Sequence, residues 1–153
     1  MPRGVAILFT HGSNMVFDKV SCDTEGRIII ASLQFNNKKF LLINLYNNND
    51  QKGQLQTISC LKSLLNQHHC DGYLPIFAGD FNFIFGENDF KFGNPILKKD
   101  SLAAITNITE KLELCDIFRV RFPDKRRFTF CQKNRSYSGD LTIFSLQISF
   151  NNM

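Results

Sequence analysis

The sequence predicts an α/β domain built around a mixed β-sheet. Short runs of β-branched and aromatic residues alternate with two segments whose apolar residues recur at helical spacing. A polar turn at 36–39 separates two of the apolar runs and indicates a hairpin, whose strands are antiparallel. The sheet is therefore not expected to be purely parallel. The length of 153 residues suits one domain with a substantial core.

The expected strands follow from the short apolar runs along the chain. They cover 5–9, 28–33, 40–46, 75–79, 127–130 and 141–150. The first of them, Val5–Ala6–Ile7–Leu8–Phe9, is continuously apolar and is therefore expected to be buried. The polar stretch at 47–50 is expected to be a loop because Asn and Asp favour turns.

Two helices are expected between these strands. The first carries apolar residues three or four positions apart and ends near 66–69; these residues are Leu55, Ile58, Leu61, Leu64 and Leu65. The second runs from Asp100 or Ser101, either of which could cap it, through Leu114. One face of this second helix carries Leu102, Ile105, Ile108 and Leu112. The segment at 116–119 closes this unit.

Composition excludes several classes of protein. No apolar run approaches the length of a membrane span, and the first residues lack the apolar region of a signal peptide, so neither a membrane contact nor secretion is expected. The chain shows no repeat and no linker, which predicts a single domain over 1–153 and a monomer. Strand-like sequence at both ends would leave open sheet edges, and the domain is therefore expected to be incomplete.

The net charge and the cysteines allow weaker conclusions about partners and compartment. The net charge of +4 is compatible with a polyanionic partner or with a solvated basic edge. The late basic residues are Arg119, Arg121, Lys125, Arg126, Arg127, Lys133 and Arg135. The five cysteines are widely spaced without a Cys-x-x-Cys pair, which favours reduced thiols in a nuclear or cytoplasmic protein. The run at 68–70, His-His-Cys, is expected at a helix end or in a surface loop, not at a metal.

The sharpest candidate site residues are Asp80 and Asn82. An apolar strand delivers this acid and this amide two residues apart, just past Gly79. Alternation along an extended chain predicts that both side chains point the same way. Such a pair can hold a water nucleophile, with the carboxylate oriented by the amide. The alternative is an ordinary exit from a strand into a turn, where Asp and Asn are common.

Two weaker groups of polar residues accompany this pair. Tyr46 ends the strand at 40–46, and its hydroxyl could donate a hydrogen bond to a phosphate oxygen. The alternative is an aromatic residue that closes the core before an Asn-rich loop. Thr129, Ser138 and Asp140 lie near basic residues and could serve a phosphate backbone, although hydroxyls and Asp are also ordinary loop residues.

The order of these motifs resembles the endonuclease/exonuclease/phosphatase superfamily, which includes abasic-site endonucleases and pancreatic deoxyribonuclease. The series is Asn-Leu-Tyr at 44–46, Gly-Asp-Phe-Asn at 79–82, Asp-Ile-Phe-Arg at 116–119, Arg-Phe-Thr-Phe at 127–130 and Ser-Gly-Asp at 138–140. The opening at 3–9, Gly26-Arg27 and the strand at 42–46 look most like the endonuclease of LINE-type retrotransposon reverse-transcriptase proteins. The resemblance covers essentially the whole chain.

This resemblance implies a four-layer α/β sandwich, in which two mixed sheets pack together between helices. The active site would lie at the strand ends along one edge. The implied reaction is hydrolysis of a phosphodiester bond in DNA with a divalent ion, Mg²⁺ or Mn²⁺.

The resemblance also implies roles for individual residues. Asp80 would position or activate the attacking water, Asn82 would orient Asp80 and the phosphate, and Tyr46 would contact the phosphate from the other side. Asn49 falls at the Asn of a Tyr-x-Pro-Asn motif, whose Pro is replaced here by Asn48, so a looser loop is expected. Thr129 and Ser138 would touch the DNA backbone. Asp140 would match the acid of a Ser-Arg-(Ile/Leu)-Asp motif, although Gly139 stands where two residues are expected, which could shift Asp140 out of register.

Two residues that the superfamily uses have no counterpart here. No residue of the chain matches the Glu that binds the metal or the His of a Ser-Asp-His motif, and no metal ligand is therefore assigned. Loss of such a general base or imidazole costs a factor of about a hundred to ten thousand. The chain is therefore expected to cleave weakly or not at all.

Two other functions remain open at this stage. One is an abasic-site repair nuclease or phosphatase of the same superfamily. The other is a remnant without catalysis, which binds nucleic acid through the late basic residues or is inert.

Overall fold

The computed structural model describes residues 4–68, 71–83, 85 and 98–125, together with the backbone of three later strands. The elements in chain order are β1 Val16–Cys22, β2 Ile28–Phe35, β3 Lys38–Tyr46, α1 Gln51–Gln67, β4 Leu74–Asp80, α2 Lys99–Lys111, α3 Ile117–Arg121, β5 Phe130–Cys131, β6 Ser138–Gly139 and β7 Thr142–Ser145. The expected alternation of strands and helices is confirmed. Thr129, Asp140 and the stretches 127–129 and 146–150 lie outside the described residues.

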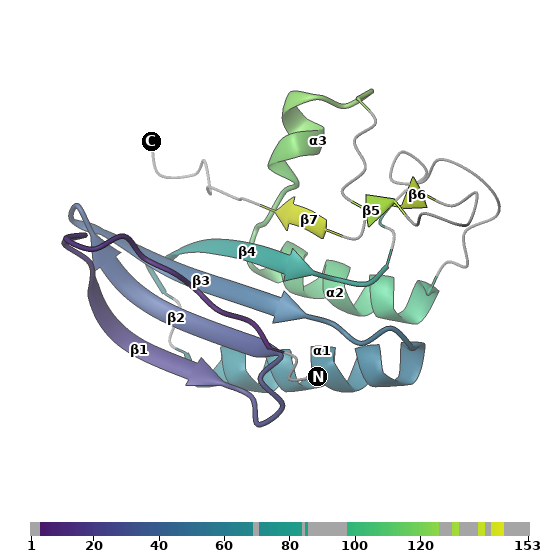
Figure 1. Ribbon diagram of the computed structural model, residues 1–153, viewed down its shortest axis with the longest axis horizontal. Helices are drawn as coiled ribbons and strands as arrows, with labels where there is room; N and C mark the ends of the chain where they lie inside the picture. Colours follow the sequence, from purple (N-terminus) through teal and green to yellow (C-terminus); the bar gives the residue numbers. More distant parts are fainter. Residues whose placement is uncertain are drawn as a thin grey trace.

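One mixed sheet organises the chain (Figure 1). Its strand order is β1-β2-β3-β4-β7, and β5 pairs with β6 in a separate two-stranded ladder. The pair β3–β4 is parallel, and the other pairs of the large sheet are antiparallel. The expected hairpin joins β2 to β3 through Asn36 and Asn37, whose φ angles of 49° and 60° fit a two-residue turn with a left-handed backbone.

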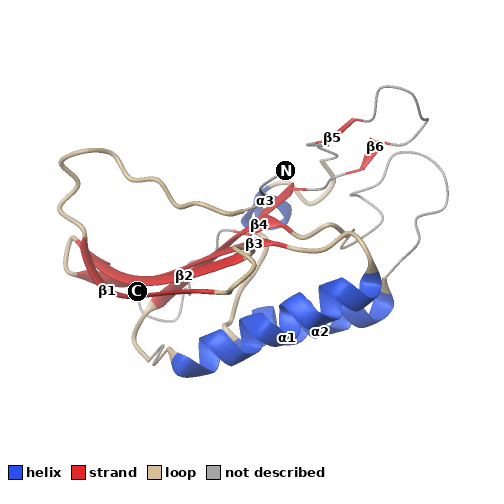
Figure 2. Cartoon of the chain, turned by 60° about the horizontal axis from the view of Figure 1, so that its bottom comes forward, coloured by secondary structure: helices blue, strands red, loops and turns tan. Residues whose placement is uncertain are grey.

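The helices α1 and α2 lie side by side on one face of the sheet (Figure 2). Burial alternates along β3, where Leu41, Ile43 and Leu45 are buried and the residues between them are partly exposed. The buried residues of the sheet meet apolar residues of the helices in one core, which includes Ile28, Ile30, Leu41, Ile43, Leu45, Ile58, Leu61, Phe77, Ile105 and Ile108. The helical periodicity therefore identified the buried faces, except at Leu55, which is 37% exposed.

The chain before β1 runs over the opposite face of the sheet (Figure 2), where Asn44 Nδ2 donates to the carbonyl oxygen of Ala6 at 3.0 Å. The prediction of a buried strand at 5–9 is wrong, because this stretch is irregular and Leu8 is 90% exposed. Val5 N donates to Gly26 O at 3.0 Å, but no strand ladder follows. An apolar run forms a strand only where a neighbouring strand satisfies its backbone.

The strand β1 was not predicted from the sequence. It lies at the edge of the sheet, and its side chains are largely exposed. Without a buried face it lacks the regular apolar alternation that identifies a half-buried strand.

The helix boundaries differ from the prediction at two places. Lys98 precedes α2 without a side-chain capping bond, so the prediction that Asp100 or Ser101 caps this helix is wrong. Asp100 lies in the first turn instead, where a carboxylate favours the positive end of the helix dipole. The short helix α3 was not predicted; Asp116 caps it by accepting hydrogen bonds from Phe118 N and Arg119 N.

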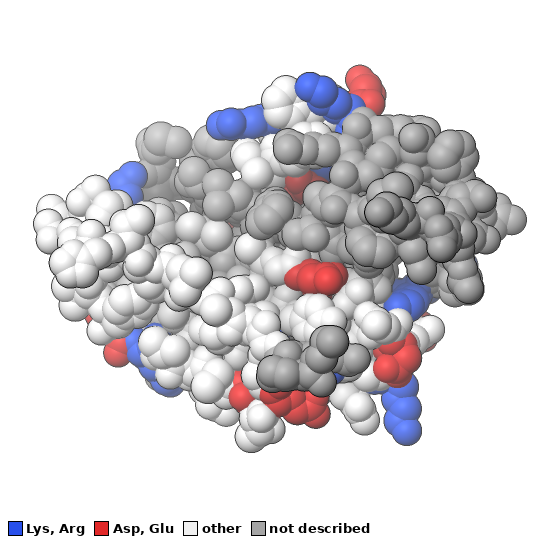
Figure 3. All heavy atoms as spheres, viewed as in Figure 1, with Lys and Arg blue, Asp and Glu red and all other residues white. Residues whose placement is uncertain are grey.

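Only some of the cysteines and of the late basic residues lie within the described part of the chain. Cys22, Cys60 and Cys115 are free thiols. The basic group at α3 and just after it consists of Arg119, Arg121 and Lys125, and Figure 3 shows basic side chains over this part of the molecule, at the top of the view. The other late basic residues lie outside the described residues. Within the described part of the chain, no helix is long and apolar enough to cross a membrane.

Candidate active site

The candidate site lies at the sheet edge where β3 and β4 end. These two strands are parallel, so their carboxyl ends lie at the same edge, and Tyr46 is directly paired with Asp80. On the other side of β4, Asp80 is paired with Thr142 at the start of β7. The first turns of α1 and α2 meet at this end of the molecule as well, because Gln51 Nε2 donates to Asp100 Oδ2 at 2.7 Å. The fold therefore brings together two residues that the sequence predicted separately.

Gly79 allows the two strands to approach at this edge. Its φ angle is 143°, and a Cβ atom at this position would lie 2.0 Å from the carbonyl oxygen of Leu45 on β3. No other residue type fits this backbone without moving one of the strands. The glycine of the Gly-Asp-Phe-Asn motif is thus required by the strand pairing that places Asp80 next to Tyr46.

Asn82 lies just beyond β4 in a left-handed conformation with a φ angle of 53°. Its backbone N–H donates to Asp80 Oδ1 at 3.0 Å, and its side-chain Nδ2 donates to the carbonyl oxygen of Asn47 at 2.7 Å. The prediction that strand alternation aligns Asp80 with Asn82 is wrong, because the strand ends at Asp80. Asn82 instead orients the Asp80 carboxylate through its backbone amide.

Asn47 connects the ends of both strands, and sequence reasoning missed it as one residue of an Asn-rich loop. It is completely buried, and its backbone N–H donates to the Asp80 carbonyl oxygen at 2.8 Å. Its side-chain Oδ1 accepts from Asn48 N at 2.9 Å. Nothing in the sequence distinguishes Asn47 from its neighbours, since its importance comes from the register of β3 against β4.

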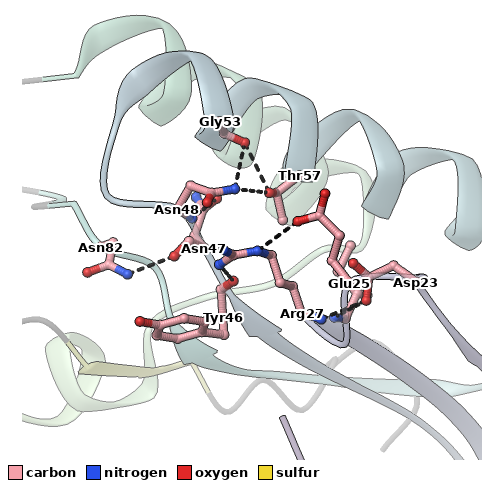
Figure 4. A network of polar contacts seen from close by, with 10 residues as sticks. Asp23, Glu25, Arg27, Tyr46, Asn47, Asn48, Gly53, Thr57 and Asn82 are labelled. Atoms are coloured by element: carbon pink, nitrogen blue, oxygen red, sulfur yellow. Dashed lines mark hydrogen bonds and ion pairs between the residues drawn. The ribbon is translucent and has the colours of Figure 1, made fainter. Parts of the chain in front are cut away.

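Asn48 anchors the loop after β3 to α1, as Figure 4 shows. Its Nδ2 donates to Gly53 O at 3.2 Å and to Thr57 Oγ1 at 2.8 Å. Side-chain hydrogen bonds thus hold this loop where the motif has the fixed φ angle of a proline, and the expectation of a looser loop stays a prediction. Asn49, the next residue, is exposed at the rim of the site.

Arg27, immediately before β2, supports Tyr46 (Figure 4). Its guanidinium carbon lies 5.4 Å from the centroid of the Tyr46 ring, and its Nη1 donates to Tyr46 O at 3.4 Å. Its Nε donates to Glu25 Oε2 at 3.0 Å. This buried arginine fixes the position of the tyrosine through a cation–π contact and hydrogen bonds. A lone Arg before an apolar run gives no sequence signal of this role.

Two side chains from the helices complete the site, and both were missed. Gln54 of α1 is completely buried, and its Nε2 donates to Asn48 O at 2.8 Å and to Asn82 O at 2.9 Å. Lys98, immediately before α2, donates from Nζ to Asn82 O at 3.2 Å and also to Asn49 O. Their partners are backbone carbonyls, so no sequence pattern predicts these contacts.

The ionisable groups of the site are shifted by burial. Burial raises the pKa of Asp80, and the hydrogen bond from Asn82 N partly offsets this shift. Burial lowers the pKa of Lys98, and the nearby Asp50 carboxylate offsets part of it. A carboxylate with a raised pKa is a better proton acceptor near neutral pH than an ordinary one.

The described residues do not by themselves fit a resident metal ion. Asp80 is the carboxylate at the paired ends of β3 and β4, and no group of three His, Cys, Asp or Glu side chains occurs within the described part of the chain. His68 lies at the end of α1, as predicted for the His-His-Cys run, and its Nε2 is 2.9 Å from Ser21 Oγ. For Ser138 the structure describes only the backbone, in β6.

Comparison with known proteins gave matches to solved structures alone, since no family profile and no curated protein matches the sequence. A 3′ phosphatase from Neisseria bound to product DNA hairpin superposes with a TM-score of 0.65 at 15% identity, over 86% of this chain and 59% of that one. An AP endonuclease from Archaeoglobus fulgidus superposes with a TM-score of 0.59 at 20% identity, over 82% of this chain and 60% of that one. These proteins belong to one superfamily.

The chain has the fold of the endonuclease/exonuclease/phosphatase superfamily. The endonuclease domain of TRAS1, a telomere-specific non-LTR retrotransposon, also matches, with a TM-score of 0.57 at 15% identity over 89% of this chain and 56% of that domain's chain. The chain thus spans less than two thirds of the length of these structures. The expected fold class is confirmed, and the expected superfamily is the one to which the matching structures belong.

Proposed function

We propose that the chain is part of a phosphodiesterase that hydrolyses DNA at the edge formed by Tyr46, Asp80 and Asn82. The observation that carries this proposal is the pairing of Tyr46 with Asp80 across the parallel strands β3 and β4, with Asn82 bound to the Asp80 carboxylate. An oriented carboxylate beside a phenol can bind a water molecule and a phosphate oxygen at adjacent positions.

Each residue has a distinct proposed role. Asp80 orients the attacking water and accepts its proton, which its raised pKa favours. Asn82 holds the Asp80 carboxylate through its backbone N–H. Tyr46, fixed by Arg27, donates from its hydroxyl to a phosphate oxygen. Asn49, at the exposed rim, is proposed to contact the substrate.

The later residues are proposed to bind the DNA backbone. Thr129 and Ser138 would contact phosphates, and Asp140 is proposed as a further acid of the site, as the resemblance to the superfamily implies. The basic group at α3, together with the net charge of +4, favours a polyanionic partner over a neutral one.

A divalent ion, Mg²⁺ or Mn²⁺, is proposed as the cofactor because structures of this superfamily belong to enzymes that generally use divalent metals. Such an ion neutralises negative charge on a phosphate when it is bound. Weak cleavage by this chain is part of the proposal, in line with what the resemblance to the superfamily implies.

Among the activities found in this superfamily, we propose that of a LINE-type retrotransposon endonuclease; the matching structures include AP endonucleases, a 3′ phosphatase and the endonuclease domain of TRAS1. A panel of three substrates separates these activities: intact supercoiled plasmid, a duplex with one abasic site, and a duplex ending in a 3′ phosphate. We expect nicking of the intact plasmid. Preference for the abasic duplex or release of phosphate by the wild-type chain, lost in Asp80→Ala, would instead assign the repair-type activity.

A further inference from the structure

Lys98 joins the two loops that carry the proposed site. Its ammonium donates to the carbonyl oxygen of Asn82, after β4, and to that of Asn49, after β3. These carbonyls belong to segments 33 positions apart in the sequence, and Lys98 reaches both from the start of α2. A cation that binds two backbone carbonyls fixes the distance between them more strongly than a neutral donor does.

The contact with Asn82 is shared with a second helix. Asn82 O also accepts from Gln54 Nε2 of α1 at 2.9 Å. Its N–H and Nδ2 donate to Asp80 and Asn47, so every polar group of Asn82 that the proposed chemistry uses is held by a named partner. Gln54 holds the turn against the core, whereas Lys98 ties it to the Asn49 carbonyl.

We infer that Lys98 is a positioning residue, which holds Asn49 and Asn82 at the separation that a bound phosphodiester requires. This inference rests on the proposed function and deepens it. Lys98 is half-buried and its contact with the Asn82 carbonyl is partly buried, so water competes less for this carbonyl than for the exposed one of Asn49, and substitution should loosen the loops without unfolding the sheet. Nothing in the motifs of the superfamily quoted above includes this lysine.

The test compares Lys98→Met with Lys98→Arg and with Lys99→Met, an exposed neighbour in the same helical turn that removes the same charge. Amide hydrogen exchange is measured by NMR for Asn48 and Asn82, with Ile30 and Ile43 of the sheet as internal references. Loss of a charge-assisted hydrogen bond predicts exchange about tenfold faster at Asn48 and Asn82 in Lys98→Met. The references should stay unchanged, Lys99→Met should match wild type, and Lys98→Arg should restore protection.

Equal exchange in Lys98→Met and Lys99→Met, or a Lys98→Met effect that Arg does not rescue, would overturn the inference. If Lys98→Met fails to fold, Lys98→Gln replaces it with the same expected direction. The exchange readout does not require catalysis, so absence of nicking by wild type counts against the proposed function alone. Where wild type nicks DNA, Lys98→Met should lower kcat about tenfold and leave KM within about twofold.

Discussion

The buried glutamine of α1 provides the sharpest stability test of the site. In Gln54→Met the side chain keeps its approximate volume but loses both hydrogen bonds, to Asn48 O and Asn82 O. Two such bonds stabilise the fold by about 1 kcal/mol each, and a buried carbonyl left without a donor costs about 1–3 kcal/mol more. Lys98 still binds Asn82 O, so this cost falls mainly on Asn48 O.

One contribution to the free energy of unfolding favours the Gln54→Met variant instead. Within the described residues Gln54 Oε1 is buried without a partner, and its removal relieves a desolvation cost of about 1–3 kcal/mol. The net expectation for Gln54→Met is therefore a loss of about 2 kcal/mol in the free energy of unfolding, because the two desolvation contributions are of similar size. For a chain of this size, that loss lowers Tm by roughly 3–10 °C.

The assay is urea denaturation followed by circular dichroism, with Gln51→Met as the matched control. Gln51 lies one helical turn earlier, is exposed, and binds the Asp100 carboxylate across the surface. Its substitution should change stability by no more than about 0.5 kcal/mol. Equal destabilisation by the two variants would refute the claim that Gln54 holds the loops of the site.

Three further variants test other parts of the account. Gly79→Ala should destabilise by about 3 kcal/mol or more because its Cβ meets Leu45 O, whereas Gly72→Ala, with φ 77° and no atom nearby, should cost about 1 kcal/mol in chemical denaturation. Asp80→Asn should be more stable than wild type at pH 7. Burial raises the pKa of Asp80 in the folded state above its value in the unfolded state, so wild type loses stability as the pH rises. The difference in Tm between the two proteins should vanish below pH 3.8. Burial lowers the pKa of His68 below 6.5, so wild type should lose stability as pH falls from 7.5 to 5, and His68→Gln should flatten that slope; equal slopes would contradict it.

The parts of the fold that the sequence predicted are those with a regular apolar pattern. The core face of α1 and the strands around Leu41, Ile43 and Leu45 follow from helical and alternating periodicity. The run at 5–9 is as apolar as these strands, but it pairs with no strand in the structure. The strand β1 is paired with β2, but it has no buried face. An apolar pattern alone therefore determines neither burial nor strand pairing, because the run at 5–9 is largely exposed and unpaired, whereas β1 is paired without a buried face.

The candidate site was predictable only where side chains themselves carry the chemistry. Tyr46, Asp80 and Asn82 stand out because polar groups follow buried strands. Gln54 and Lys98 could not be found in this way, since they act on backbone carbonyls that the fold brings within reach. The left-handed backbone of Asn82 also brings its N–H, in place of the expected side-chain amide, to the Asp80 carboxylate.

The most direct test of the proposed phosphodiesterase is nicking of supercoiled plasmid by the full chain over long incubation, with and without Mg²⁺. Asp80→Ala removes the proposed base, and Asp71→Ala, an exposed Asp at the opposite end of β4, serves as the control. The proposed function predicts slow nicking that requires Mg²⁺, persists in Asp71→Ala and disappears in Asp80→Ala. Nicking that survives in Asp80→Ala, or no nicking from folded wild-type protein, would contradict it.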